Sequence, residues 1–256
     1  MTQALHRPPS VDILASRAKV AVVVPATNTI VQPEMEAMRP PGVTNHVTRM
    51  LLPPRPYNDM AVYQKALETE TGELEDALKL VLPCEPHVVA HGHSIHSFRG
   101  DRARAEGETA RLEAHCGIPF ITPSMAVLAG LEAIGVKRIA VLTPYWPPAD
   151  AMISAFFTSC GYEVVAADGL KTTGPTRVAQ VPHDAIRAGF RAIDSARVEA
   201  LVHVGTNLPV SAITDEIEAA HGKPLIGVNV ATYWLALRRI GIADRIAGFG
   251  RLARDY

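Results

Sequence analysis

The chain repeats itself, and this internal repeat constrains its fold more than any other feature of the sequence. Three pairs of similar segments occur in the same order in the two parts of the chain. The first members are 19–25 (KVAVVVP), 88–93 (VVAHGH) and 119–135 (PFITPSMAVLAGLEAIG), and the second are 138–144 (RIAVLTP), 201–206 (LVHVGT) and 224–241 (PLIGVNVATYWLALRRIG). The alternative is a coincidence among Val-rich strand patterns, but three matches in one order favour two equivalent halves.

Each half alternates short apolar runs with longer helical patterns. Continuous Val-rich runs, typical of strands buried on both faces of a parallel sheet, occupy 20–24, 88–90, 139–142 and 201–204. Helical patterns occupy 63–82, 185–193 and 212–220, and Pro83 ends the first of them. This alternation predicts an α/β fold made of two pseudo-symmetric halves, each a doubly wound, flavodoxin-like parallel sheet.

No obvious linker divides the chain, so the predicted boundaries follow from the repeat. We expect the first half to span 1–118, with 1–17 as an N-terminal extension, and the second half to span 119–225. Residues 226–256 are expected to form C-terminal helices that pack back on the first half. If the repeat is cut elsewhere, the break lies at 135–137.

The composition narrows the class of function. Hydrophobic residues make up 48% of the 256 residues, and 25 basic residues face 26 acidic ones without a basic stripe, which argues against a nucleic-acid partner. The apolar runs are too short to span a bilayer, and the N-terminus lacks the apolar core of a signal peptide. Three cysteines without metal-ligand spacing fit a reducing compartment. We therefore predict a cytoplasmic protein that binds neither membranes nor nucleic acid.

The sequence signatures of several enzyme classes are missing. The first predicted strand is not followed by G-x-G-x-x-G, and the chain contains neither a Walker loop nor a G-x-S-x-G nucleophile turn. The sequence thus gives no support for a dinucleotide, an NTP or serine-hydrolase chemistry, and we expect no cofactor.

Polar residues cluster directly after the predicted strands of both halves. In open α/β sheets, ligands bind outside the carboxyl ends of the strands, so two facing halves would enclose a cleft lined by these loops. Hydroxyl, amide and imidazole groups, with glycines that let backbone N–H groups approach a ligand, suit a small anionic substrate. These residues are Thr27, Asn28, Gly92, His93, Ser94, Tyr145, Gly205, Thr206 and Asn207.

At these loops the sequence resembles the aspartate/glutamate racemase superfamily, and within it maleate cis–trans isomerase and arylmalonate decarboxylase. The resemblance rests on four segments and covers nearly the whole chain: 22–28 (VVVPATN), 91–101 (HGHSIHSFRGD), 142–146 (LTPYW) and 202–209 (VHVGTNLP). It implies a cofactor-free enzyme with two pseudo-symmetric α/β halves that acts on a small carboxylic acid between them. It also implies a dimer or another homo-oligomer.

The chain departs from this family at its most characteristic residues. The racemases carry a cysteine at the end of the third strand of each half, maleate isomerases use a cysteine there as a nucleophile, and arylmalonate decarboxylases keep the second as proton donor. The corresponding residues are Gly92 and Gly205, whereas the cysteines present, Cys84, Cys116 and Cys160, fall elsewhere. The resemblance therefore implies carbanion chemistry on a carboxylate without a catalytic thiol.

The remaining polar residues receive roles from the same resemblance. Tyr145 matches a tyrosine near the developing charge, and Ser94 matches a hydroxyl that holds an enediolate. His93 stands where the decarboxylases have threonine, and because imidazole is the usual acid/base at neutral pH, we expect it to carry the proton. We expect the other loop residues to bind the substrate: Thr27, Asn28, Gly92, Gly205, Thr206 and Asn207.

Two other functions remain open from the sequence. His91 and His93 alternate at a strand end and His203 lies at the matching strand, so the three imidazoles could form an open zinc site of a lyase or hydrolase. The halves could also close around a small carboxylate without catalysis. We favour a cofactor-independent isomerase or lyase with an enediolate-like intermediate and no metal.

Overall fold

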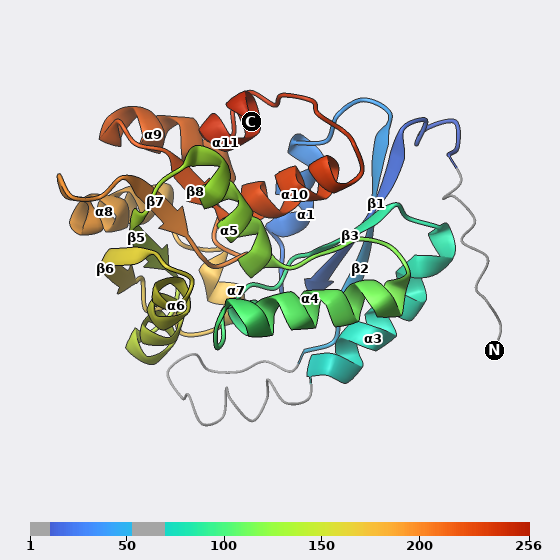
Figure 1. Ribbon diagram of the computed structural model, residues 1–256, viewed down its shortest axis with the longest axis horizontal. Helices are drawn as coiled ribbons and strands as arrows, with labels where there is room; N and C mark the ends of the chain where they lie inside the picture. Colours follow the sequence, from blue (N-terminus) through green and yellow to red (C-terminus); the bar gives the residue numbers. More distant parts are fainter. Residues whose placement is uncertain (1–10, 53–69) are drawn as a thin grey trace.

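Each half of the chain builds one four-stranded parallel β-sheet, and the two sheets have the same strand order. The computed structural model describes residues 11–52 and 70–256. Its strands run in the order β2-β1-β3-β4 in the first sheet and β6-β5-β7-β8 in the second, and all pairs are parallel. The repeated segments therefore occupy equivalent places, which confirms the predicted α/β fold with two equivalent halves. Figure 1 shows the two sheets on opposite sides of the molecule, with helices α5 and α10 between them.

The strands are short and mostly buried. In chain order they are β1 (Ala18–Pro25), β2 (Val43–Met50), β3 (Val88–His91), β4 (Phe120–Ile121), β5 (Arg138–Thr143), β6 (Glu163–Gly169), β7 (Ala200–His203) and β8 (Leu225–Gly227). The four predicted strand segments coincide with β1, β3, β5 and β7. All four lie inside their sheets, flanked by a strand on each side, where strands buried on both faces are apolar.

Helices connect the strands and cover both faces of each sheet. They are α1 (Val31–Ala37), α3 (Glu70–Val81), α4 (Arg102–Cys116), α5 (Pro123–Ile134), α6 (Pro147–Ser159), α7 (Pro175–Val178), α8 (His183–Ile193), α9 (Thr214–His221), α10 (Val228–Arg239) and α11 (Gly250–Asp255). Short 3-10 turns, η1 (Leu82–Cys84), η2 (Ile95–Ser97) and η3 (Ser211–Ile213), complete the order. The predicted helices at 185–193 and 212–220 are confirmed as α8 and as η3 with α9. The helix predicted over 63–82 is confirmed from residue 70, and 63–69 lie outside the described residues.

The strand register brings the functional loops together. In the first sheet Val23 of β1 is paired with His91 of β3, and in the second Leu142 of β5 is paired with His203 of β7. Because parallel strands end at the same edge, the loop after β1 lies beside the loop after β3. The loops after β5 and β7 are adjacent for the same reason.

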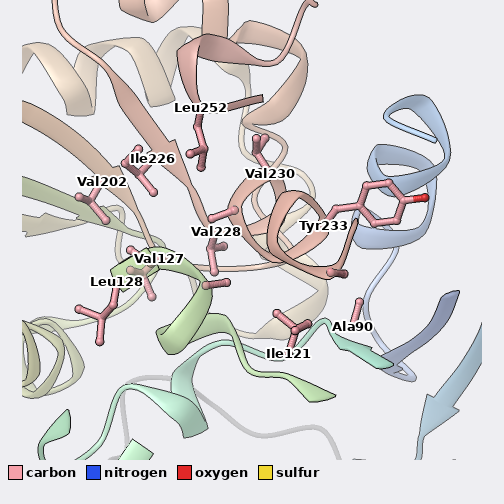
Figure 2. Close-up of a cluster of buried hydrophobic side chains, with 14 of the residues drawn as sticks. Ala90, Ile121, Val127, Leu128, Val202, Ile226, Val228, Val230, Tyr233 and Leu252 are labelled. Atoms are coloured by element: carbon pink, nitrogen blue, oxygen red, sulfur yellow. The ribbon is translucent and has the colours of Figure 1, made fainter. Parts of the chain in front are cut away.

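One hydrophobic core runs through both halves. It combines residues of both sheets, such as Ala90 and Val202, with residues of α5 and α10, such as Val127 and Tyr233. Figure 2 shows these side chains converging between the sheets, with Tyr233 reaching towards the first half. Two smaller clusters cover the outer faces, one under α8 and one under α3. The shared core joins the sheets through apolar packing, which is the dominant favourable contribution to folding.

The predicted domain boundaries at residues 118 and 225 stay a prediction. Helix α10, which follows the second boundary, packs most extensively on α5 and also contacts α1, β3 and β4 of the first half. In the described part of the chain, no helix has the length and apolar character needed to cross a bilayer.

Candidate active site

Ser94 lies at the centre of a hydrogen-bonded cluster that joins the two halves. It follows β3, and its hydroxyl lies 3.2 Å from the hydroxyl of Tyr145, which follows β5. The backbone N–H of Thr206, after β7, donates to Ser94 Oγ at 3.3 Å. Ser94 is fully buried, and Tyr145 and Thr206 are nearly so. Three loops that are far apart in the sequence thus present polar atoms to one another at the carboxyl ends of their strands.

Asn28 adds the loop after β1 to this cluster. Its Nδ2 donates to Thr206 Oγ1 at 3.4 Å, while its Oδ1 accepts the backbone N–H groups of Ile30 and Val31. The side chain therefore caps the start of α1 and contacts the second half at the same time. A capping role and a role in the site are compatible, since the capping bonds fix the direction of the amide.

Asn207, in the loop after β7, also holds the loop after β1. Its Oδ1 accepts the backbone N–H of Thr29 at 2.9 Å, and its Nδ2 donates to the carbonyls of Thr27 at 3.4 Å and Pro175 at 2.8 Å. Thr27 contributes its backbone to this contact. The structure therefore brings together six of the predicted loop residues: Thr27, Asn28, Ser94, Tyr145, Thr206 and Asn207.

A buried carboxyl group holds the turn that carries Tyr145. Thr143 Oγ1 donates to Asp150 Oδ1 at 2.5 Å and accepts the backbone N–H of Tyr145 at 2.9 Å. Burial raises the pKa of Asp150, and the hydrogen bond from Thr143 opposes part of that rise. A side chain at Gly169 would overlap the Tyr145 carbonyl and Asp150. The backbone of Tyr145 is thus fixed at both its N–H and its carbonyl.

The two glycines at the strand ends leave no room for a side chain. A Cβ at Gly92 would lie 2.8 Å from Val24 Cγ1 and 2.9 Å from Val31 Cγ1. A Cβ at Gly205 would lie 2.7 Å from Pro144 Cγ and closer still to its Cδ. Gly205 also has a φ of +148°, which side chains disfavour. The backbone at both positions is therefore shaped around glycine.

His203 is a structural residue of the second half. It lies on the face of β7 that packs under α8, as alternation with Leu201 requires, and its Nε2 lies 3.0 Å from the Gly205 carbonyl. Because a carbonyl only accepts, the ring donates through Nε2–H. Burial lowers the pKa of His203 to about 3, so the ring is neutral at physiological pH. It supports the carbonyl of the loop that carries Thr206.

The alternative zinc site is wrong. His91 shares a face of β3 with Val89, in the cluster under α3, and its ring lies 5.7 Å from that of Phe120. His203 lies on the α8 side of the other sheet, so the three imidazoles do not meet at one site. Among residues 11–52 and 70–256, no three His, Cys, Asp or Glu side chains are grouped as metal ligands.

His93, the predicted proton carrier, points differently from Ser94. Its ring is half-buried and lies 6.1 Å from the ring of His91, in an edge-on arrangement. Ser94, the next residue, instead faces Tyr145 and Thr206. The assignment of His93 as proton carrier stays a prediction.

The three cysteines lie outside the strand-end loops. Cys84 is in η1, Cys116 ends α4 and Cys160 follows α6. All are free and half-buried, and burial raises the pKa of each thiol, that of Cys116 to about 11. Since the thiolate is the reactive form, these cysteines are poor nucleophiles at neutral pH.

Two residues next to the cluster escaped the sequence analysis. Glu34 of α1 accepts from Asn229 Nδ2 at 2.6 Å and from the Ser211 backbone N–H at 3.0 Å. Burial raises the pKa of Glu34, and these hydrogen bonds oppose part of that rise. The repeat offered one signal, because it aligns Asn229 with Ser124 at the strand-to-helix turn of the first half. No sequence pattern pointed to Glu34, because its partners come from the other half.

A comparison with family models decides the classification. The model described as arylmalonate decarboxylase matches residues 63–253. The chain belongs to the arylmalonate decarboxylase family. This family membership agrees with the resemblance seen in the strand-end loops.

Curated relatives of this arylmalonate decarboxylase family member carry two enzyme names. The chain is 26% identical over 248 residues to the maleate isomerase of Nocardia farcinica, covering 93% of this chain and 96% of that protein. It is 32% identical over 167 residues to the arylmalonate decarboxylase of Bordetella bronchiseptica, covering 63% of this chain and 68% of that protein.

Solved structures confirm the fold. The maleate cis–trans isomerase of Nocardia farcinica bound to TRIS superposes with a TM-score of 0.82 at 23% identity, covering 93% of this chain and 98% of that one. A liganded double mutant of arylmalonate decarboxylase gives a TM-score of 0.81 at 24% identity, covering 93% of this chain and all (100%) of that one. Both show the same two-halved α/β architecture.

Proposed function

We propose that this protein is a cofactor-independent isomerase or lyase that acts on a small carboxylate or dicarboxylate through an enediolate-like intermediate. The observation that carries the proposal is the cluster of Ser94, Tyr145 and Thr206, in which two hydroxyl groups and a backbone amide from both halves meet at the strand ends. Membership of a family that contains decarboxylases supports the reaction class.

The cluster suits a reaction that places negative charge on a carboxylate oxygen. In a decarboxylation, the bond between the α-carbon and the departing carboxylate breaks, and CO₂ leaves. The electron pair stays on the substrate as an enediolate, and a proton then adds to the α-carbon. Hydroxyl donors such as Ser94 and Tyr145 stabilise the enediolate oxygen, and low exposure strengthens that interaction.

Neutral donors around the cluster provide contacts for the substrate carboxylates. Asn28 and Thr206 lie within hydrogen-bond distance of each other, and Asn207 links their loops. Gly92 and Gly205 belong to the loops that carry these donors, and both strand ends are packed too closely for a side chain. A charge-assisted hydrogen bond from such donors is roughly twice as strong as a neutral one, which favours an anionic ligand. Thr27 borders this region through its carbonyl.

We assign the proton step to His93. A thiol carrier at residue 92 or 205 would require a side chain where the backbone accommodates glycine. His93 directly precedes Ser94 in the loop after β3, and imidazole is the side chain that most often acts as general acid or base. Its removal in His93→Ala should lower turnover by about 10²–10⁴-fold, the usual contribution of general acid–base catalysis. An unchanged kcat in this variant would remove His93 from the mechanism.

The test of the function is proton NMR in D₂O with maleate, phenylmalonates, aspartate, glutamate and hydantoins as substrates. We expect deuterium incorporation, isomerisation or CO₂ loss with at least one of them. Tyr145→Phe and Ser94→Ala should each lower that rate by about 10²–10³-fold, the typical effect of one oxyanion donor. Tyr162→Phe is the matched control, because Tyr162 is a buried tyrosine packed against Phe157 and outside the cluster.

Thermal melting with the same acids separates an enzyme from a binding protein. Ligand-induced shifts in melting temperature without any turnover would indicate the non-catalytic alternative. A folded protein that turns over none of these acids would contradict the proposed reaction class. Activity that survives in both Tyr145→Phe and Ser94→Ala would contradict the role of the cluster.

A further inference from the structure

A series of hydrogen bonds runs from α1 of the first half to the Thr206 loop of the second. Asn229 Nδ2 donates both to Glu34 Oε2 at 2.6 Å and to the Thr206 carbonyl at 2.9 Å. Glu34 Oε1 accepts the backbone N–H of Ser211 at 3.0 Å. Asn229 and Ser211 are each only 2% exposed. The amide N–H groups of Asn229 and the backbone N–H of Ser211 therefore find acceptors away from bulk solvent, where a lost partner is expensive.

The partners of Asn229 fix the direction of its amide. Its NH₂ group faces two acceptors, the Glu34 carboxylate and the Thr206 carbonyl. Within the described residues, no donor contacts its Oδ1. A flipped amide would place Oδ1 against two other oxygens, which is unfavourable. Glu34 thus orients the amide of Asn229, and that amide in turn holds the carbonyl of Thr206.

Thr206 is held at three of its polar atoms. Its carbonyl accepts from Asn229, its Oγ1 accepts from Asn28, and its N–H donates to Ser94 Oγ. Asn28 precedes α1 and Glu34 lies within it, so one short segment of the first half reaches Thr206 from two directions. Because the Thr206 amide occupies an acceptor position of Ser94 Oγ, the hydroxyl proton of Ser94 is directed elsewhere, towards Tyr145 or a bound oxygen.

We propose that Glu34 and Asn229 are positioning residues for the reaction. They hold Thr206 across the boundary between the halves, so that its backbone amide orients the Ser94 hydroxyl. The inference rests on the proposed function for the role of Ser94. Neither residue is a catalytic residue, since both act through Thr206.

The first test is Glu34→Gln, with Glu36→Gln as its matched control. The introduced amide has one oxygen in place of two, so it cannot accept from both Asn229 and the Ser211 N–H, and the amide that holds Thr206 loses its fixed direction. Turnover of whichever acid proves active should fall by about 10–100-fold, because a misplacement of about 1 Å can have that effect, while KM changes little. Glu36 lies on the same helix, paired with Arg39 at the surface. Its substitution removes the same charge and should leave turnover unchanged.

A double variant separates positioning from stability. In Glu34→Gln combined with Asn229→Asp, the introduced glutamine donates its NH₂ group to the introduced carboxylate, which restores the bond between the halves. The introduced aspartate has no N–H for the Thr206 carbonyl, so that bond stays broken. We expect the urea midpoint to recover only part of the loss seen in Glu34→Gln, because a carboxylate oxygen now faces the Thr206 carbonyl, while turnover stays low. If turnover recovers together with stability, the pair has a structural role and the inference is wrong.

Hydrogen exchange gives a readout that does not depend on the substrate. The Thr206 amide should exchange faster in Glu34→Gln than in the wild-type protein or Glu36→Gln, as measured by mass spectrometry of peptides spanning 204–208. Unchanged exchange in folded Glu34→Gln would overturn the inference even if the proposed reaction is found. Faster exchange in a protein that turns over none of the acids would support the positioning and contradict the proposed function. If Glu34→Gln does not fold, Glu34→Asp takes its place, because the shorter carboxylate cannot reach both partners.

Discussion

Replacing Gly205 with alanine should destabilise the protein strongly, because the position is closed to side chains for two independent reasons. Its φ of +148° is disfavoured for a residue with a Cβ, at a cost of about 1–3 kcal/mol. The new methyl group would also overlap the ring of Pro144, and overpacking of this kind costs about 1–3 kcal/mol. Together these effects predict a loss of about 2–6 kcal/mol, a large part of a typical stability of about 5–15 kcal/mol.

Urea unfolding followed by circular dichroism measures this loss, and two other glycines calibrate it. Gly92→Ala meets valine side chains without unfavourable φ, so it should lose about 1–3 kcal/mol. Gly107→Ala, at an open position in α4, should gain about 0.5–1 kcal/mol. If Gly205→Ala lies within about 0.5 kcal/mol of the wild-type protein, as ordinary surface substitutions do, the loop is not shaped around glycine. The argument against a thiol at residue 205 would then fail.

Other predictions concern the supports of the site. The pKa of His203 is about 3 in the folded protein and near 6.5 when unfolded, so the unfolded state binds the proton first as pH falls. His203 should therefore lower the free energy of unfolding by up to about 1.4 kcal/mol per pH unit below pH 6. Urea unfolding across pH 4.5–7 should give a shallower slope for His203→Gln, and parallel slopes would contradict the burial of a neutral ring. Thr143→Val leaves the Asp150 carboxyl without its donor and should lose about 1–3 kcal/mol by urea unfolding. It should also lower turnover more than Tyr162→Phe does, and equal rates would show that Tyr145 needs no support from Thr143.

The sequence predicted those parts of the fold that depend on local patterns. Strands β1, β3, β5 and β7 contain uninterrupted apolar runs because both of their faces are buried, and the repeat placed them in two halves. The four edge strands, β2, β4, β6 and β8, went unpredicted. In β2 and β6 polar and half-exposed residues interrupt the apolar pattern, and β4 and β8 have only 2 and 3 residues.

The same distinction applies to the site. Asn28, Ser94, Thr206 and Asn207 were predicted because they directly follow strands, where position along the chain determines position in the sheet. The zinc hypothesis failed because alternation gives the face of a strand but not which way that face is turned in the assembled protein. Glu34 could not be predicted for a related reason, since its partners come from the other half and only the packing of the halves brings them together.

The central claim is that this member of the arylmalonate decarboxylase family generates its carbanion without a thiol. The most direct measurement is proton NMR in D₂O of a variant in which Cys84, Cys116 and Cys160 are all alanine, compared with the wild-type protein on the acid that the wild-type protein turns over. None of these thiols lies in a strand-end loop, so turnover should stay close to the wild-type value. A folded variant that loses turnover by about 10²-fold or more would show that a cysteine takes part in the chemistry and would contradict the account.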